Sequence, residues 1–320
     1  MSNKIVVVHK CLDSSSREAI EKAAVKYGCS VEFYVTEEEA LPHLADADII
    51  YGQGNALIAA APNLKWFCSL TAGMEGYLTP GVVDPEKTLL SSSSGSYGVT
   101  ISEHIIMVTL MLLRQQISYS EIVRSHTWVR DLPIRSIRDS RIVILGTGDL
   151  GSQAAERFTS FNPASITGVS RSGRSSEKAF DKVLPIGQLD EILPETDILV
   201  LCLPRTAETD DLLKGKLSLL PSHAILVNVG RGNILDEDEL MKLLKEEKLG
   251  GAALDVFRQE PLPADSPLYN CPNLLITPHI AGNMTLDYTI RRNVELFLED
   301  LDNYFAGKPL ARQISWENGY

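Results

Sequence analysis

Three residues far apart in the chain, Arg231, Glu260 and His279, have side chains that together could catalyse the reduction of a carbonyl group on an anionic substrate by a hydride donor. Each lies just after an apolar run of the kind that forms a buried strand. The planar fork of an arginine suits a carboxylate. A carboxylate beside an imidazole stabilises the imidazolium, which can then give its proton to a forming alkoxide. Taken singly, each of the three is equally an ordinary loop charge or a structural histidine, so the prediction depends on their acting as a set.

A glycine-rich turn upstream predicts a dinucleotide site. Gly146, Gly148 and Gly151 follow the apolar run 141–145 and open a helical pattern over 149–160. Glycines allow a tight turn and close approach of the backbone to a pyrophosphate, and the helix N-terminus faces the phosphate charge. A glycine-rich turn in an unrelated α/β protein is the alternative, although the strand and the helix are both in place here.

The next apolar run ends in a sequence that indicates the cofactor. Ser170 stands where NAD-binding proteins usually have Asp or Glu for the ribose hydroxyls, and it is followed by Arg171, Ser172 and Arg174. A carboxylate would repel a 2′-phosphate, whereas arginine binds one through charge-assisted hydrogen bonds. The pattern favours NADP over NAD; the alternative is that both arginines are solvated loop residues.

The elements that must hold these residues are short apolar runs alternating with helical patterns, which indicates parallel sheets covered on both faces. The predicted strands fall into two series, with the first at 5–9, 31–35, 48–51, 66–70 and 88–90, and the second at 141–145, 166–170, 182–184, 197–203, 224–229, 251–256 and 274–277.

A polar, serine-rich run at 91–98 separates the two series and predicts a domain boundary or hinge. One long helix is expected over 99–123, and a last helix over 285–304 that returns to the first domain. The fold class is therefore α/β, with two doubly wound parallel-sheet domains. We expect a flavodoxin-like substrate domain at 1–98 and 285–320, and a Rossmann dinucleotide-binding domain inserted at 99–284.

Composition narrows the class of protein. The chain has 320 residues, 44% of them hydrophobic, and a net charge of −12, which argues against nucleic-acid or anionic-membrane partners. An anionic substrate and cofactor then need local positive charge, for which Arg171, Arg174 and Arg231 are the candidates. The five cysteines are scattered without metal-ligand spacing, so we expect a reduced, cytoplasmic protein without a bound metal and without a signal peptide. The apolar run 105–113 is too short to span a bilayer.

Eight motifs in one order resemble the D-isomer-specific 2-hydroxyacid dehydrogenase family over essentially the whole chain. They are 70–76 (Leu-Thr-Ala-Gly-Met-Glu-Gly), 101–104 (Ile-Ser-Glu-His), 144–151 (Ile-Leu-Gly-Thr-Gly-Asp-Leu-Gly), 201–206 (Leu-Cys-Leu-Pro-Arg-Thr), 227–232 (Val-Asn-Val-Gly-Arg-Gly), 253–257 (Ala-Leu-Asp-Val-Phe), 259–263 (Gln-Glu-Pro-Leu-Pro) and 277–282 (Thr-Pro-His-Ile-Ala-Gly). The stretch at 170–172 makes the chain most similar to the NADPH-dependent glyoxylate/hydroxypyruvate reductase branch.

The resemblance implies roles for particular residues. Arg231, Glu260 and His279 would be catalytic, with Arg231 and His279 also contacting the substrate. The substrate carboxylate would be held by backbone amides near Ala72, Gly73 and Met74, in a loop that reads Ala-Gly-Met-Glu where many members have Ala-Gly-Val-Asp. Asp255 would face the nicotinamide carboxamide. The remaining cofactor-binding candidates are Gly146, Gly148, Asp149, Leu150, Gly151, Ser170, Arg171, Ser172, Arg174, Leu203, Pro204 and Val229.

The sequence thus predicts an NADPH-dependent reductase that converts small 2-oxo acids into D-2-hydroxy acids, and the resemblance implies a homodimer built on the cofactor domain. Glyoxylate, hydroxypyruvate, phenylpyruvate and branched oxo acids all fit this prediction, and the physiological direction stays open. Two alternatives remain. One is a dinucleotide-sensing binding protein on the same fold, like the co-repressors related to the family. The other is an NAD-dependent D-2-hydroxyacid dehydrogenase, such as a short phosphoglycerate dehydrogenase.

Overall fold

The computed structural model describes residues 3–175, 178–317 and 319, and the chain divides into two compact units. Unit 1 comprises Met1–Tyr97 and Met284–Tyr320, and unit 2 comprises Gly98–Asn283. These bounds differ by one residue at each crossing from the domains predicted above, because Gly98 already begins the first helix of unit 2 and Met284 already belongs to unit 1.

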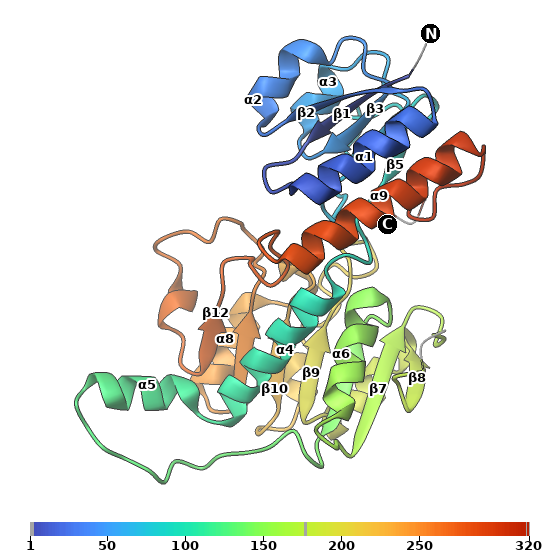
Figure 1. Cartoon of the computed structure of the whole chain (residues 1–320). Helices are drawn as coiled ribbons and strands as arrows, with labels where there is room; N and C mark the ends of the chain where they lie inside the picture. The colour runs from blue at the N-terminus through green and yellow to red at the C-terminus, as the bar shows by residue number, and fades with distance from the viewer. Residues whose placement is uncertain (1–2, 176–177, 318, 320) are drawn as a thin grey trace. The chain divides into compact units, whose positions relative to one another are not determined.

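Unit 1 is a parallel sheet in the order β2-β1-β3-β4-β5 with helices on both faces (Figure 1). One face packs against α1 (Ser14–Lys26) and α9 (Asp287–Phe305), and the other against α2 (Glu37–Ala40) and α3 (Asn55–Ala59). Its strands are β1 (Lys4–Val8), β2 (Ser30–Tyr34), β3 (Ile49–Gly52), β4 (Trp66–Ser69) and β5 (Leu89–Ser91).

Unit 2 is a parallel sheet in the order β12-β11-β10-β9-β6-β7-β8. Figure 1 shows α4 (Gly98–Leu113) and α6 (Asp149–Thr159) on one face; α7 (Leu189–Ile192) and α8 (Glu237–Lys245) pack on the other. The strand order reverses between β6 and β9, which is where open α/β sheets bind dinucleotides. The strands are β6 (Arg141–Leu145), β7 (Ser165–Ser170), β8 (Lys182–Pro185), β9 (Ile198–Leu201), β10 (Ile225–Asn228), β11 (Gly251–Leu254) and β12 (Leu274–Ile276).

The predicted fold class, two parallel-sheet α/β domains, is confirmed, and every predicted strand has a counterpart. The prediction of one long helix over 99–123 is wrong. The helix α4 ends at Leu113, and a separate helix α5 (Gln116–Arg124) begins after Gln115, whose φ of 57° is left-handed. The apolar pattern that buries α4 ends at Leu113, and no residue of α5 is buried, so packing does not keep the two segments in one line. Over the part of the chain that the structure describes, no helix combines the length and apolarity needed to cross a membrane.

Candidate active site

The predicted catalytic residues all belong to unit 2 and follow three neighbouring strands. Arg231 follows β10, Glu260 follows β11 and His279 follows β12, and these strands pair side by side in parallel. The carboxyl ends of parallel strands meet at one edge of a sheet, where loops can bring polar side chains together without burying their charges in the core. The fold therefore places all three residues at the same edge.

Glu260 and His279 form a hydrogen-bonded pair. His279 Nδ1 lies 2.6 Å from Glu260 Oε2, and Glu260 Oε1 accepts a hydrogen bond of 2.9 Å from the backbone amide of Phe257. With its carboxylate held at both oxygens, Glu260 fixes the orientation of the imidazole ring. A proton on Nδ1 faces the carboxylate, so Nε2 is the nitrogen that can exchange a proton with a bound molecule. Both side chains are partly exposed, at 52% for His279 and 34% for Glu260.

The backbone at His279 is strained, and Asp255 holds it. His279 has a φ of 54°, a left-handed conformation that is uncommon outside glycine, and its amide donates to the Asp255 carbonyl oxygen at 2.9 Å. The buried Asp255 carboxylate accepts from Thr277 Oγ1 at 2.6 Å and from the amides of Ile280 and Ala281, each at 2.9 Å. Asp255 thus anchors the turn on both sides of the histidine. The role toward the nicotinamide carboxamide that the resemblance implies for Asp255 stays a prediction.

Two other histidines are poor candidates for the acid. Burial lowers the pKa of His9 to about 4, and its Nδ1 already accepts a hydrogen bond from the Cys11 amide. Burial also lowers the pKa of His104, although the nearby charge of Asp255 opposes this shift. Both imidazoles are therefore neutral at neutral pH, which leaves the carboxylate-paired His279 as the better proton donor.

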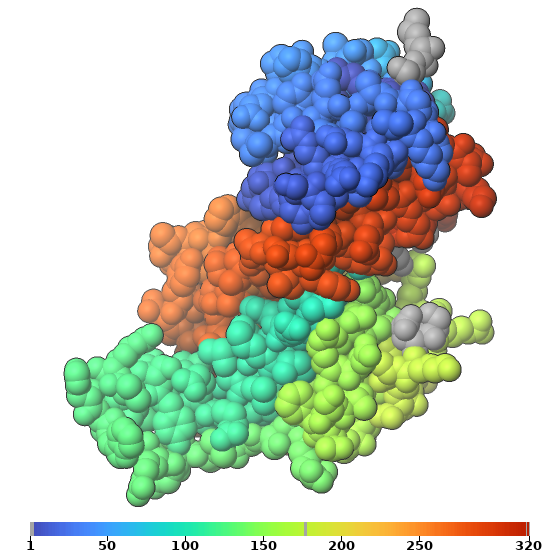
Figure 2. All heavy atoms as spheres, in the orientation of Figure 1, coloured from blue at the N-terminus to red at the C-terminus, as the bar shows by residue number. Residues whose placement is uncertain are grey.

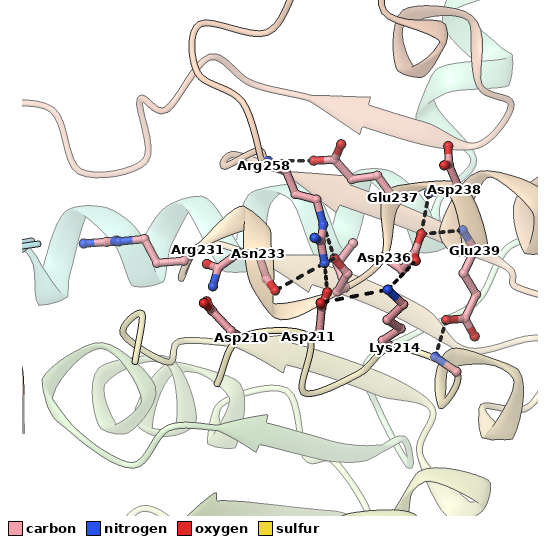
Figure 3. A network of polar contacts seen from close by, with 12 residues as sticks. Asp210, Asp211, Lys214, Arg231, Asn233, Asp236, Glu237, Asp238, Glu239 and Arg258 are labelled. Atoms are coloured by element: carbon pink, nitrogen blue, oxygen red, sulfur yellow. Dashed lines mark hydrogen bonds and ion pairs between the residues drawn. The ribbon is translucent and has the colours of Figure 1, made fainter. Parts of the chain in front are cut away.

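Asn228 shapes the loop that carries Arg231. This fully buried side chain donates from Nδ2 to the Arg231 carbonyl oxygen at 3.0 Å and accepts from the Gly230 amide at 3.1 Å. Arg231 Nη1 in turn donates to the Gly230 carbonyl oxygen at 2.7 Å. Figure 3 shows the guanidinium extending away from the neighbouring cluster of charged residues. Within the motif Val-Asn-Val-Gly-Arg-Gly, the Asn228 side chain therefore fixes the backbone that carries the arginine.

Gly232 brings the Arg231 loop directly against the Glu260 loop. A Cβ at position 232 would lie 1.9 Å from the carbonyl carbon of Phe257 and 2.4 Å from the amide nitrogen of Arg258. Only a residue without a side chain allows the two backbones to meet here. The Phe257 amide also donates to the Glu260 side chain. The backbone contact between Gly232 and Phe257 therefore couples the position of Arg231 to that of Glu260.

The glycine-rich turn fits a dinucleotide pyrophosphate. A Cβ at Gly151 would lie 1.9 Å from the Gly146 carbonyl oxygen, and Gly146 has a φ of 99°, so the turn itself requires both glycines. At Gly148, by contrast, a Cβ would meet no protein atom within 4 Å. This glycine precedes α6 and makes no side-chain capping hydrogen bond, so the open space lies at the N-terminus of a helix, where the helix dipole favours an anion. Of the other residues predicted here, Asp149 and Leu150 form that first turn.

The loop after β7 is closed by Ser170. Its hydroxyl donates to the Arg174 carbonyl oxygen at 3.0 Å and accepts from the Arg174 amide at 3.2 Å. Gly173 allows the closure with a φ of 68°. Arg171, Ser172 and Arg174 are exposed on this small loop. Ser170 thus sets the shape of a loop that presents two arginines, a role that its neutral hydroxyl permits and a carboxylate would not. Leu203, Pro204 and Val229, also predicted to contact the cofactor, lie just past β9 and β10.

The predicted substrate loop lies in unit 1, after β4. Thr71 closes it, since its amide donates to Ser69 Oγ at 3.1 Å and its hydroxyl donates to the Gly73 carbonyl oxygen at 3.0 Å. Among the described residues, the amides of Ala72, Gly73 and Met74 donate to no protein acceptor. Successive amides of this kind can bind an anion. The Met74 side chain is buried in the core of unit 1, so only its backbone is available to a ligand.

The structure brings Glu260 and His279 into contact and places Arg231 on an adjoining loop. Sequence reasoning missed Asn228 and the anchoring role of Asp255. A signal existed for both, because each is a polar residue at the end of an otherwise apolar strand. Within the described residues, no group of His, Cys, Asp or Glu side chains is arranged to hold a metal ion.

Comparison with known proteins identifies the family of this chain. The family model for the NAD binding domain of D-isomer specific 2-hydroxyacid dehydrogenases matches residues 106–281. A glyoxylate/hydroxypyruvate reductase B from Pectobacterium carotovorum is 30% identical over 265 residues, covering 78% of this chain and 82% of that protein. A D-isomer specific 2-hydroxyacid dehydrogenase family protein from Aeromonas salmonicida superposes with a TM-score of 0.86 at 32% identity, covering 99% of this chain and 100% of that one. An NADPH-dependent glyoxylate/hydroxypyruvate reductase from Sinorhizobium meliloti, solved with NADP and sulfate, gives a TM-score of 0.82 at 27% identity, with both chains covered completely.

Proposed function

Because this chain belongs to the D-isomer-specific 2-hydroxyacid dehydrogenase family, we propose that it reduces small 2-oxo acids to D-2-hydroxy acids with NADPH. The observation that carries the proposal is the hydrogen bond of 2.6 Å between His279 Nδ1 and Glu260 Oε2. It leaves Nε2 of an oriented imidazole to serve as the acid. The glyoxylate/hydroxypyruvate reductases among the relatives support the substrate class.

Each residue has a defined part in the proposed reaction. The Arg231 guanidinium binds the substrate carboxylate and polarises the C2 carbonyl. In unit 1, the successive backbone amides of Ala72, Gly73 and Met74 offer donors to a carboxylate. When bound, the reduced nicotinamide supplies the hydride that reaches C2. His279 gives its Nε2 proton to the carbonyl oxygen as negative charge develops there, and Glu260 stabilises the imidazolium before the transfer.

The experiment that tests this function is steady-state NADPH oxidation with a panel of 2-oxo acids, namely glyoxylate, hydroxypyruvate, phenylpyruvate and a branched oxo acid. We expect turnover with the smaller members, and the order of kcat/KM identifies the preferred substrate. The alternative, a dinucleotide-sensing binding protein on this fold, predicts NADPH binding without turnover of any member.

Cofactor choice gives a separate prediction. A charge-assisted hydrogen bond is worth about 1.5–3 kcal/mol, so one good arginine contact to the 2′-phosphate gives roughly a tenfold to hundredfold preference for NADPH. The double variant Ser170→Asp/Arg171→Ala removes one cation and places a carboxylate beside the ribose. We expect kcat/KM to shift toward NADH while kcat with saturating oxo acid is retained. Kinetics with both cofactors measure this.

Lys178→Ala is the matched control, since it removes a nearby exposed cation from outside the 170–174 loop, and it should keep the preference. Equal efficiency of the wild type with NADH and NADPH would show that Arg171 and Arg174 are solvated charges. The chain would then be an NAD-dependent dehydrogenase.

We also propose that the chain forms a homodimer, and the surface that supports this proposal belongs to unit 2. Figures 1 and 2 show α5 and the segment that follows it projecting from the body of this unit. Trp128 is 85% exposed and Val123 65%, and Ile134 and Met107 are also exposed. We take these exposed apolar side chains as part of a surface that another protein covers, and in a C2 dimer a second copy supplies the matching surface.

We therefore expect Trp128→Glu to convert a dimer into a monomer in sedimentation equilibrium, because it places a charge in the covered surface. Val25→Glu changes an exposed apolar residue on α1 in unit 1 and should leave the dimer intact. A wild-type monomer, or a Trp128→Glu variant that stays dimeric, would refute this interface.

A further inference from the structure

Three loops at the substrate edge of unit 2 are joined by one side chain, Arg258. The loops follow β9, β10 and β11, which are neighbours in the sheet. Arg258 lies in the loop after β11. Its Nε and Nη2 donate to the Leu235 carbonyl oxygen at 2.9 and 2.7 Å, in the loop after β10. Its Nη2 also forms an ion pair with Asp211, in the loop after β9. Figure 3 shows the Arg258 guanidinium beside Asp211.

Backbone contacts reinforce the same junction. The Arg258 amide donates to Glu237 Oε1 at 2.8 Å, which ties the β11 loop to the start of α8. The Asp211 amide donates to the Asn233 carbonyl oxygen at 2.8 Å, and the Leu213 amide to the Ile234 carbonyl oxygen at 2.9 Å. Arg258 therefore connects loops that are already joined by backbone hydrogen bonds, and its guanidinium lies where these loops meet.

The junction lies next to both the Arg231 loop and the Glu260–His279 pair. Gly232, next to Arg231, packs against the backbone of Phe257 and Arg258. Phe257 donates at 2.9 Å to Glu260, whose other oxygen holds His279. A small movement of the backbone at 257–258 would shift Glu260 and the Arg231 loop relative to each other. Misplacing a catalytic group by about 1 Å can cost roughly a hundredfold in rate.

We propose that Arg258 is a positioning residue, which holds the Arg231 loop and the Glu260 loop in register without touching the substrate. The inference rests on the proposed reductase function. It assigns Arg258 a role beyond that of a surface ion pair, although its side chain is 38% exposed, because two of its bonds go to a backbone carbonyl of another loop. Lysine has no fork and cannot make these bonds together with the Asp211 pair.

The test compares Arg258→Ala and Arg258→Lys with a matched control, Lys214→Met. Lys214 belongs to the same cluster and shares Asp211 with Arg258, at 4.0 Å; it also lies 3.9 Å from Asp236, but it makes no described contact with residues 257–260. We expect Arg258→Ala to lower kcat roughly tenfold to a hundredfold, with KM for NADPH within about twofold of the wild type. Arg258→Lys should recover little of the loss. Guanidinium ion at a non-denaturing concentration should raise kcat in Arg258→Ala and not in the wild type. Lys214→Met should keep the wild-type kcat.

Amide hydrogen exchange provides a readout that needs no substrate. The Phe257 amide, bound by Glu260, should exchange faster in Arg258→Ala, while the Leu226 amide in the centre of the sheet stays protected. Wild-type kcat in Arg258→Ala would overturn the proposal. So would a loss that Lys214→Met reproduces, or unchanged exchange at Phe257. If the wild type reduces no oxo acid, the proposed function fails, and the exchange experiment still tests whether Arg258 holds the loop.

Discussion

Alanine at position 279 is expected to lower the rate of 2-oxo acid reduction by roughly a hundredfold or more, since a positioned general acid contributes about a hundredfold to ten-thousandfold. His279 Nδ1 is engaged by Glu260 at 2.6 Å, and no other described histidine is paired with a carboxylate at this edge of the sheet. Without the imidazole, the developing alkoxide has no proton donor. Steady-state kinetics of NADPH oxidation measure the loss, and NADPH fluorescence titration should show affinity close to the wild type.

The variant Glu260→Gln tests the contribution of the carboxylate separately from that of the imidazole. The amide keeps the size of the side chain and loses the charge that stabilises the imidazolium. We therefore expect kcat to fall, but by less than in His279→Ala, because the imidazole that donates the proton is still present. His223→Ala is the control, because that histidine pairs with Asp197 at the opposite end of the sheet. Near-normal turnover in His279→Ala would remove the residue from the mechanism.

Arg231→Lys is the second change with a large expected effect. Lysine keeps the charge but not the two parallel donors that match a carboxylate, so we expect KM for the oxo acid to rise roughly tenfold to a hundredfold and kcat to fall as well. The hydrogen bonds of Asn228 go to the backbone of Gly230 and Arg231 and not to the arginine side chain, so the loop should keep its shape in the variant. Kinetics at varied oxo acid and fixed, saturating NADPH measure both constants.

Arg231→Lys also has a result that would reassign the residue. A rise in KM for NADPH with no change in KM for the oxo acid would make Arg231 a cofactor residue. Arg205→Lys is a suitable comparison, since Arg205 pairs at 3.3 Å with Asp210 in its own exposed loop.

The strands were predictable because burial on both faces of a parallel sheet requires continuous apolar runs, as in Ile142–Leu145 and Ile198–Leu201. The break between α4 and α5 was not. Apolar residues continue past Leu113 at Ile117 and Ile122, and periodicity alone does not show that α5 has no surface of this unit to pack on. Burial of the Met74 side chain was equally hidden, since a methionine in a loop has no pattern that separates a core contact from a pocket.

At the site, the predicted positions of Arg231, Glu260 and His279 follow from the rule that strand ends share one edge. The residues that hold them in place were beyond that rule. Asn228 and Asp255 bond to backbone groups of turns, and the strain at His279 depends on those bonds. Each is visible in the sequence as a polar residue after an apolar run, but its hydrogen-bond partners depend on the path of a loop in space, which neither residue spacing nor hydrophobic period encodes.

The most direct test of the central claim combines turnover with product identity. The purified chain is incubated with NADPH and hydroxypyruvate, oxidation of NADPH is followed by absorbance, and the product is resolved by chiral chromatography. The proposed function predicts one D-glycerate formed for each NADPH consumed, with the reaction nearly abolished in His279→Ala. NADPH binding without oxidation of NADPH by hydroxypyruvate or any other 2-oxo acid of the panel, or formation of L-glycerate, would contradict it.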